Sequence, residues 1–149
     1  MRLLAPVPAK RGKNHVFISY AREDAATHTE CLLRALSNKA ITVWNDQKMR
    51  PGVPFPRALE QAIDQSFAMV ALVSAGALES RWVRAEWCYA FSKRSTTIIP
   101  VVIPEYKVRR FPIELSIFSP VYLEKSAYDD SLQNVVTLVE FARDFPSRW

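Results

Sequence analysis

The run FAMVALV, from Phe67 to Val73, constrains the fold more than any other stretch because every residue in it is apolar. A strand that is apolar on both faces must be covered on both faces. This is the position of a central strand in a parallel sheet that has helices packed on each side. The run therefore predicts the central strand of an α/β sheet.

The segments around this strand alternate between strand-like and helix-like patterns. Further strands are predicted at His15–Ser19 (HVFIS), Ile41–Trp44 (ITVW), Thr96–Ile103 (TTIIPVVI) and Ser119–Leu123 (SPVYL). Helices are predicted from Asp24 through Leu36, over Arg57–Gln65, around Glu86 and over Asp129–Phe145; Ser74–Ser80 is expected to be a loop, and Pro104–Ser119 a loop with a short helix. Parallel neighbours need right-handed crossover connections, so the alternation predicts a doubly wound five-stranded parallel sheet with helices on both faces. Pro100 lacks a ladder donor, which predicts a bulge there or a position near the sheet edge.

The composition is that of one globular domain, with 149 residues of which 49% are hydrophobic and 23% charged. No apolar run approaches the roughly 18 residues of a membrane span, and the proline-broken opening MRLLAPVPAKRGK does not fit a secretory signal. We expect a cytoplasmic protein without a membrane partner, with a basic N-terminal tail at 1–13 and one domain at 14–149. Cys31 and Cys88 fall among apolar neighbours in helix-like segments and are expected to be reduced, buried thiols.

The basic residues are dispersed along the chain, although the net charge is +5 and the pI is about 9.4. Aromatic and basic residues do not alternate as a platform for a nucleic-acid strand requires, so a solvated basic surface is expected rather than a specific nucleic-acid site. The two histidines, His15 and His28, lie far from any Cys-x-x-Cys spacing. The sequence therefore predicts no metal site.

Ligands of an open parallel sheet bind at the carboxyl ends of the strands, where the strand order reverses. The chain has only three glycines, which are too few for a Gly-rich dinucleotide turn or a phosphate-binding loop. A phosphoacceptor receiver needs an aspartate where Ser74 follows the third strand. A serine hydrolase needs a Gly-x-Ser-x-Gly elbow and a downstream histidine, and neither is present.

Glu86 is the remaining candidate, in the segment RWVRAEWCYAF. At about 100° per residue it lies between Trp82 and Ala90 on the helix, with Val83 and Trp87 flanking the same stripe. One interpretation is a surface glutamate at the edge of the stripe that pairs with Arg57 or Lys93. The other is a partly desolvated carboxylate beside an indole, which can hold a planar cation and stabilise positive charge that develops on it. Spacing alone does not separate the two.

Five motifs in order resemble a Toll/interleukin-receptor (TIR) domain over about residues 14–145. They are VFISYAREDA, WNDQKMRPGVPF, LEQAIDQS, ALVSAGALES and SRWVRAEWCYA. The W-V-x-x-E pattern is similar to that of the bacterial, NAD-cleaving branch. The resemblance implies a flavodoxin-like fold, in agreement with the sheet predicted above, and makes residues 14–149 the TIR domain.

In enzymatic TIR domains the glutamate that corresponds to Glu86 is catalytic. The resemblance therefore implies an NAD+ nucleosidase that yields nicotinamide and ADP-ribose or a cyclic ADP-ribose isomer, with NAD+ as substrate and no cofactor. It implies substrate contacts from Trp82, Tyr20, Arg22, Asp46 and Ser19. The alternatives are a core tryptophan at Trp82, a strand-end filler at Tyr20 and a turn-former at Asp46. Ala21 departs from the family, because many relatives carry a basic residue after the tyrosine.

The loop after the second predicted strand, Asp46–Phe55, corresponds to the loop through which TIR domains self-associate. Its candidate contact residues are Lys48, Met49, Arg50, Pro51, Gly52 and Phe55. The resemblance thus implies other TIR domains as partners, in a homo-oligomer or filament that activates the enzyme. It also implies a sensor domain or partner protein and a role in bacterial immune, antiviral defence. The alternative is a non-catalytic adaptor that binds other TIR domains in signalling and does not need Glu86.

Overall fold

A five-stranded, all-parallel sheet forms the centre of the molecule, in the order β2-β1-β3-β4-β5. The computed structural model describes residues 13–44, 57–93, 95–107 and 110–146. The strands are β1 (His15–Ser19), β2 (Val43–Trp44), β3 (Ser66–Val73), β4 (Thr97–Val102) and β5 (Val121–Tyr122). This is the flavodoxin-like order. The predicted doubly wound sheet is confirmed, with the apolar run at its centre.

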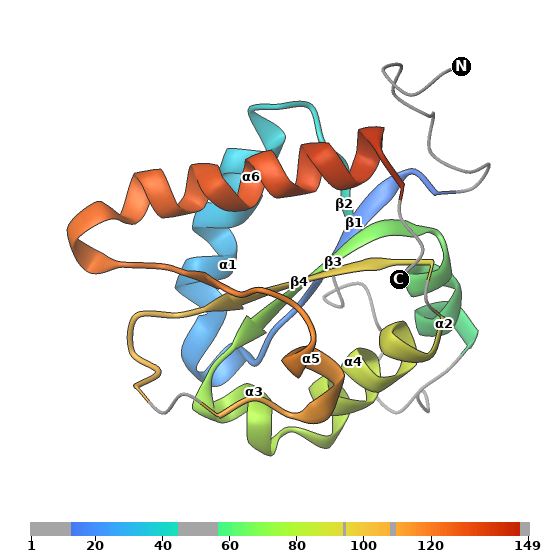
Figure 1. Ribbon diagram of the computed structural model, residues 1–149, viewed down its shortest axis with the longest axis horizontal. Coiled ribbons are helices and arrows are strands. Elements are labelled where there is room, and N and C mark those ends of the chain that lie inside the picture. Colours follow the sequence, from blue (N-terminus) through green and yellow to red (C-terminus); the bar gives the residue numbers. More distant parts are fainter. Residues whose placement is uncertain (1–12, 45–56, 94, 108–109, 147–149) are drawn as a thin grey trace.

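Helices cover both faces of the sheet (Figure 1). One face carries α1 (Arg22–Ser37) and α6 (Tyr128–Asp144), which follows the 3-10 turn η2 (Lys125–Ala127). The other face carries α2 (Arg57–Asp64), α3 (Ala75–Glu79), α4 (Arg81–Lys93) and α5 (Ile113–Ser116).

The alternation of side chains along β3 divides the core in two. Ala68, Val70 and Leu72 pack beneath α1 and α6, whereas Met69 and Val73 pack with the helices of the other face. All eight residues of β3 are buried. A strand buried on both sides is therefore what the apolar run required.

Pro100 causes no bulge between β3 and β4, since the register runs without a shift from the pair Ala68–Thr97 to Val73–Val102. The other expectation for Pro100, a place near the sheet edge, is confirmed, because β4 is the neighbour of the edge strand β5. β5 pairs only with Val101 and Val102, which follow the proline. The edge pairing thus begins after the residue that lacks an N–H.

Two other expectations differ from the structure. The predicted loop Ser74–Ser80 contains the helix α3, whose first turn is capped by the Ser74 hydroxyl, which accepts from the Ala77 N–H at 3.1 Å. Cys88 was expected to be buried and is exposed, while Cys31 is half-buried. The buried stripe of α4 runs through Val83, Glu86, Trp87 and Ala90, and Cys88 lies off it.

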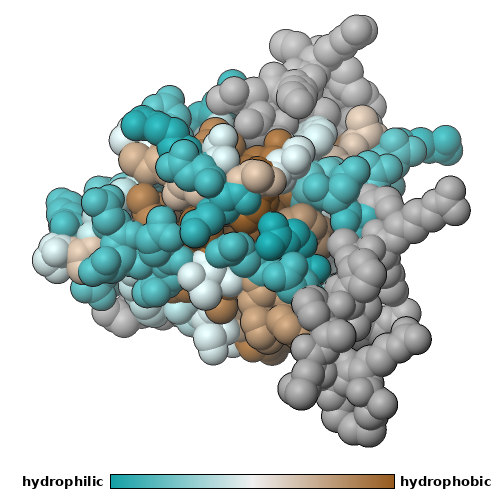
Figure 2. All heavy atoms as spheres, turned by 90° about the horizontal axis from the view of Figure 1, so that it is seen from above, coloured by the Kyte–Doolittle hydropathy of each residue, from teal (hydrophilic) through white to brown (hydrophobic). Residues whose placement is uncertain are grey.

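The surface seen from the side of α6 is largely hydrophilic, with hydrophobic residues showing between polar ones (Figure 2). Leu138 and Phe141 on α6 and Phe145 just after it are exposed, and the two phenylalanine rings lie 4.8 Å apart. Among the described helices, none has the length and apolar character that crossing a bilayer requires.

Candidate active site

Glu86 is fully buried, with 0% of its surface exposed, in the middle of the apolar stripe of α4. Val83 and Trp87 sit one turn before it and one residue after it, and both pack against the sheet. The stripe thus turns the glutamate inward with its apolar neighbours. The interpretation of Glu86 as a surface glutamate is wrong for the described structure.

The carboxylate of Glu86 meets the end of β1. The Ser19 hydroxyl donates to Glu86 Oε1 at 2.6 Å, and Ser19 is itself 1% exposed. Ser19 is the last residue of β1, and the sheet order reverses between β1 and β3. The acid therefore lies at the switch point where doubly wound sheets bind their ligands.

A second acid, Asp24, links the segments that follow β1 and β3 at the carboxyl ends of these two strands. Its carboxylate accepts from the Ser74 hydroxyl at 2.7 Å and from the Gly76 N–H at 2.8 Å. A Cβ on Gly76 would stand 2.9 Å from Glu23 Oε2 and 3.0 Å from Asp24 Oδ1, so a larger residue there would require these carboxylates to shift. The sequence analysis missed the contact, because its partners are 50 and 52 residues apart. The one local feature that indicates part of this arrangement is Ser74, a residue type that often caps the first turn of a helix.

The other predicted site residues are placed differently with respect to Glu86. Trp82 lies one turn earlier on α4, half-buried against the same core. Tyr20 is 4% exposed and packs in the core beneath α1 and α6, on the opposite side of the sheet. Arg22 is exposed at the first residue of α1. The substrate contacts assigned to these three residues stay predictions.

The predicted residues of the segment after β2 lie outside the described residues. They are Asp46, Lys48, Met49, Arg50, Pro51, Gly52 and Phe55. Ala21, the departure from the family pattern, is buried at the N-cap of α1.

A third acid, Glu114, lies near α4 and has a cationic partner. Arg84 Nε donates to Glu114 Oε1 at 2.9 Å, which joins α4 to α5, and Glu114 is 4% exposed. Desolvation raises the pKa of the nearby Cys88 thiol, and the carboxylate of Glu114 raises it further. Glu114 is thus a structural counter-ion, although it is buried nearly as deeply as Glu86. The spacing of 30 residues hid this pair from sequence analysis.

A polar chain on the other face joins α1, α6 and the segment after β4. His28 Nε2 lies 2.7 Å from Glu105 Oε1, and Nδ1 lies 2.5 Å from the Tyr128 hydroxyl. An ionised carboxylate only accepts, so Nε2 carries the proton toward Glu105. Desolvation raises the pKa of Tyr128, with Cys31 adding to the shift. Burial alone would raise the pKa of Glu105, but the hydrogen bond from His28 contributes to a net lowering.

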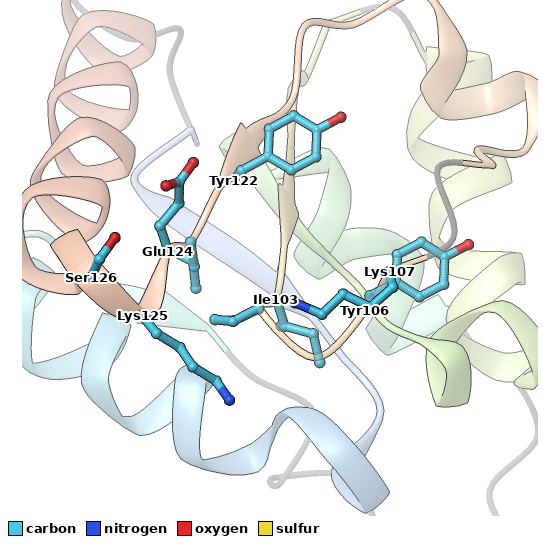
Figure 3. Close-up of a pocket in the computed structure, with 9 residues that line it drawn as sticks. Ile103, Tyr106, Lys107, Tyr122, Glu124, Lys125 and Ser126 are labelled. Carbon is cyan, nitrogen blue, oxygen red and sulfur yellow. The ribbon is translucent and has the colours of Figure 1, made fainter.

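A hollow of about 470 Å³ opens at the carboxyl ends of β4 and β5 (Figure 3). Its lining residues are Ile103, Pro104, Tyr106, Lys107, Tyr122, Leu123, Glu124, Lys125 and Ser126. Tyr122, Glu124 and Ser126 come from β5 and the segment that leads into α6, while Tyr106 and Lys107 come from the segment after β4. None of the predicted site residues that the structure describes lines it, and β3 separates β4 from β1. Glu86 and this hollow therefore lie at different places along the carboxyl ends of the strands.

In the described part of the chain, no group of three or more His, Cys, Asp or Glu side chains is arranged to hold a metal ion. The arrangement at Glu86 offers a buried carboxylate that accepts a hydrogen bond from a hydroxyl, with an indole one turn away. Such a site can stabilise positive charge that develops on a bound molecule.

A curated relative with a named activity is similar to most of this chain. It is "NAD(+) hydrolase PdTIR" from Paracoccus denitrificans (strain Pd 1222), which is 27% identical over 125 residues. The alignment covers 83% of this chain and 41% of the relative, so this chain spans less than half the length of that protein.

Solved structures show the same fold at low sequence identity. A metazoan TIR-STING receptor from C. gigas, in complex with 2′,3′-cGAMP, superposes with a TM-score of 0.69 at 22% identity, over 95% of this chain and 43% of that one. The TIR domain of the Toll-related Receptor TRR-2 from Hydra magnipapillata superposes with a TM-score of 0.68 at 20% identity, over 84% of this chain and 97% of that one. The family model described as "TIR domain" matches residues 16–138, which begin at the second residue of β1 and include Ser19 and Glu86. The chain therefore belongs to the TIR domain family.

Proposed function

We propose that this domain cleaves the bond between nicotinamide and ribose in NAD+, with Glu86 as the catalytic carboxylate. The observation that carries the proposal is the burial of Glu86 at the switch point, where Ser19 holds it at 2.6 Å. The similarity to a protein named as an NAD(+) hydrolase supports the choice of substrate. In this proposal residues 14–149 form the catalytic domain and residues 1–13 its basic tail.

The chemistry suits a site with one acid at its centre. Nicotinamide leaves a pyridinium as a neutral molecule, so its departure requires no general acid. Positive charge develops on the ribose as the bond breaks, and a carboxylate held in a low-dielectric site stabilises that charge more strongly than water does. Water or the adenine ring completes the reaction, giving ADP-ribose or a cyclic isomer, and analysis of the products separates these two outcomes.

The burial of Glu86 also bears on activation. With 0% of its surface exposed, the carboxylate cannot meet a ribose unless neighbouring groups move. We propose that self-assembly with other TIR domains opens and completes the site, in response to a sensor domain or partner in bacterial immune defence. A lone domain would then be nearly silent.

The test of the catalytic role is Glu86→Gln. Glutamine keeps the shape and an acceptor for Ser19 but removes the charge, so nicotinamide release should fall by on the order of a hundredfold or more. Glu114→Gln is the matched control, because it makes the same change at another buried acid, which is 4% exposed. Its activity per folded molecule should stay within about threefold of wild type. Equal activity in wild type and Glu86→Gln would place the chemistry elsewhere.

The second candidate function is a non-catalytic adaptor, which the complete closure of Glu86 also favours. An adaptor binds other TIR domains and needs no open site. Wild-type protein incubated with NAD+, dilute and then concentrated with a crowding agent, separates the two functions. Nicotinamide release that rises steeply with concentration supports the assembled enzyme, and no release in any condition supports the adaptor.

A further inference from the structure

Ser19 is the residue in contact with Glu86 that the proposed reaction has not yet explained. Its hydroxyl is 1% exposed and faces the carboxylate at 2.6 Å. The sequence analysis grouped Ser19 with substrate contacts such as Trp82, which is half-buried. The structure instead directs the hydroxyl to the acid.

We propose that Ser19 is the positioning residue of Glu86: its hydroxyl fixes one carboxylate oxygen, so that the acid is oriented before substrate binds. The inference rests on the proposed function for its catalytic readout. A short hydrogen bond to a charged acceptor is stronger than one between neutral groups. Here both partners are also withdrawn from water, which would otherwise compete for the donor.

The element that carries Ser19 is suited to this task. β1 pairs with β2 on one side and β3 on the other, and all five of its residues are buried. Glu86 has a long side chain on a helix that packs against the sheet. A donor on the rigid strand therefore restricts the rotamers of the more flexible acid, which is how a supporting group keeps a reacting group in its productive geometry.

Two roles for Ser19 predict different kinetics. If its hydroxyl orients Glu86, Ser19→Ala leaves substrate binding intact and weakens stabilisation of the developing charge. The value of kcat should then fall by about ten- to a hundredfold, with KM within about twofold of wild type. A hydroxyl that binds substrate equally in the ground and transition states would raise KM and leave kcat unchanged.

Ser66→Ala is the matched control for Ser19→Ala. Ser66 is 0% exposed and donates to the Ala62 carbonyl at 2.6 Å, but it lies at the amino end of β3, whereas Ser19 lies at the carboxyl end of β1. This variant should lose stability to a similar degree, as thermal unfolding can measure, while kcat and KM per folded molecule stay unchanged. Ser19→Thr restores the hydroxyl and should recover most of the lost kcat.

A spectroscopic measurement tests the contact without turnover. In protein labelled with ¹³C at glutamate side-chain carboxyls, the Glu86 resonance is the one that Glu86→Gln removes. That resonance should shift in Ser19→Ala, return toward its wild-type position in Ser19→Thr and stay fixed in Ser66→Ala.

The outcomes separate this inference from the proposed function. An active wild type with unchanged or raised kcat in Ser19→Ala, or an unmoved Glu86 resonance, overturns the positioning role alone. A wild type that never releases nicotinamide, with the resonance moving as expected, overturns the enzymatic function and leaves the Ser19–Glu86 contact as a structural one.

Discussion

Arg84 and Glu114 form an ion pair in which one charge is buried and the other is not. The Glu114 side chain is 5% exposed and that of Arg84 38%, so the pair lies between the surface and interior cases. Breaking a buried pair is costly because one charge is left without compensation, whereas exposed pairs contribute little. Removal of Arg84 should therefore lower the stability of the protein, because it leaves the buried carboxylate of Glu114 without its cationic partner.

Arg84→Ala should lower the free energy of unfolding by about 1–2 kcal/mol, a value below that for a fully buried pair because water reaches the arginine. Arg143→Ala is the control, since Arg143 and Asp144 make a 3.0 Å pair in which both side chains are over a third exposed. It should cost less than about 0.5 kcal/mol. Urea unfolding of both variants measures the difference. Equal losses of unfolding free energy would show that the burial of Glu114 does not increase the contribution of its ion pair to stability.

At the residue level, the sequence was enough to predict which face of a helix a side chain occupies, but not which side chain from a distant segment it contacts. The helical stripe selected Glu86, although spacing left open whether it was a surface glutamate or a partly desolvated carboxylate. The apolar neighbours of Cys88 in the sequence suggested burial, but neighbours one residue away lie about 100° round a helix, and the thiol is exposed. The Ser19–Glu86 bond spans 67 residues, and no local pattern contains it.

At the scale of elements, Asp24 joins the start of α1 to the start of α3. The helix α3 is only five residues long, so most of its backbone groups lie at its ends. Asp24 accepts from the Gly76 N–H and from Ser74, which in turn caps Ala77. A short helix beside the candidate site is therefore held by a side chain from another element.

Asp24→Ala should destabilise the protein by about 1–3 kcal/mol, because two donors at the start of α3 lose a charged acceptor. The control is Asp130→Ala, which removes an exposed aspartate from the first turn of another helix, α6, and should cost only a few tenths of a kcal/mol. Hydrogen exchange gives the local readout: the amides of α3 should exchange faster in Asp24→Ala alone. If the two variants lose the same stability, the contribution of Asp24 is a helix-dipole effect and not a link between elements.

The elements themselves could be predicted to different degrees. Long periodic segments were identified within a few residues, as for α6, predicted over Asp129–Phe145 and observed over Tyr128–Asp144. The helix α3 was missed because it is held by Asp24, which is remote in sequence. β2 was predicted over Ile41–Trp44 and spans only Val43–Trp44, because at a sheet edge a strand extends only as far as its single neighbour pairs with it.

For the whole molecule, the alternation of strands and helices was enough to predict the doubly wound sheet, because an apolar central strand leaves few other ways to bury both faces. The candidate site was predictable in its acid but not in its closure. Burial of Glu86 depends on β1, α4 and their neighbours together. An apolar stripe on a helix predicts which way a side chain points. Whether water reaches that side chain depends on the other elements that pack around it.

The same packing sets a prediction for alkaline pH. Desolvation is the first cause that raises the pKa of three groups, the neighbours Cys88 and Tyr89 on α4 and Tyr128 at the start of α6. A raised pKa means that the native state keeps protons that the unfolded chain has already released. Stability is therefore fully present below the unfolded pKa values, about 8.5 for cysteine and 10 for tyrosine, and falls as pH rises through the native ones.

Urea unfolding between pH 7 and 11 should show this loss, and Tyr128→Phe should reduce its slope above pH 10. The change in slope should correspond to at most one proton, because only the titration of Tyr128 is removed. The variant also loses the hydrogen bond to His28, but that loss appears as an offset already present at pH 7. Slope and offset are therefore measured independently. A wild-type stability that stays flat or increases toward pH 11 would mean that these side chains release their protons as readily in the folded protein as in the unfolded chain.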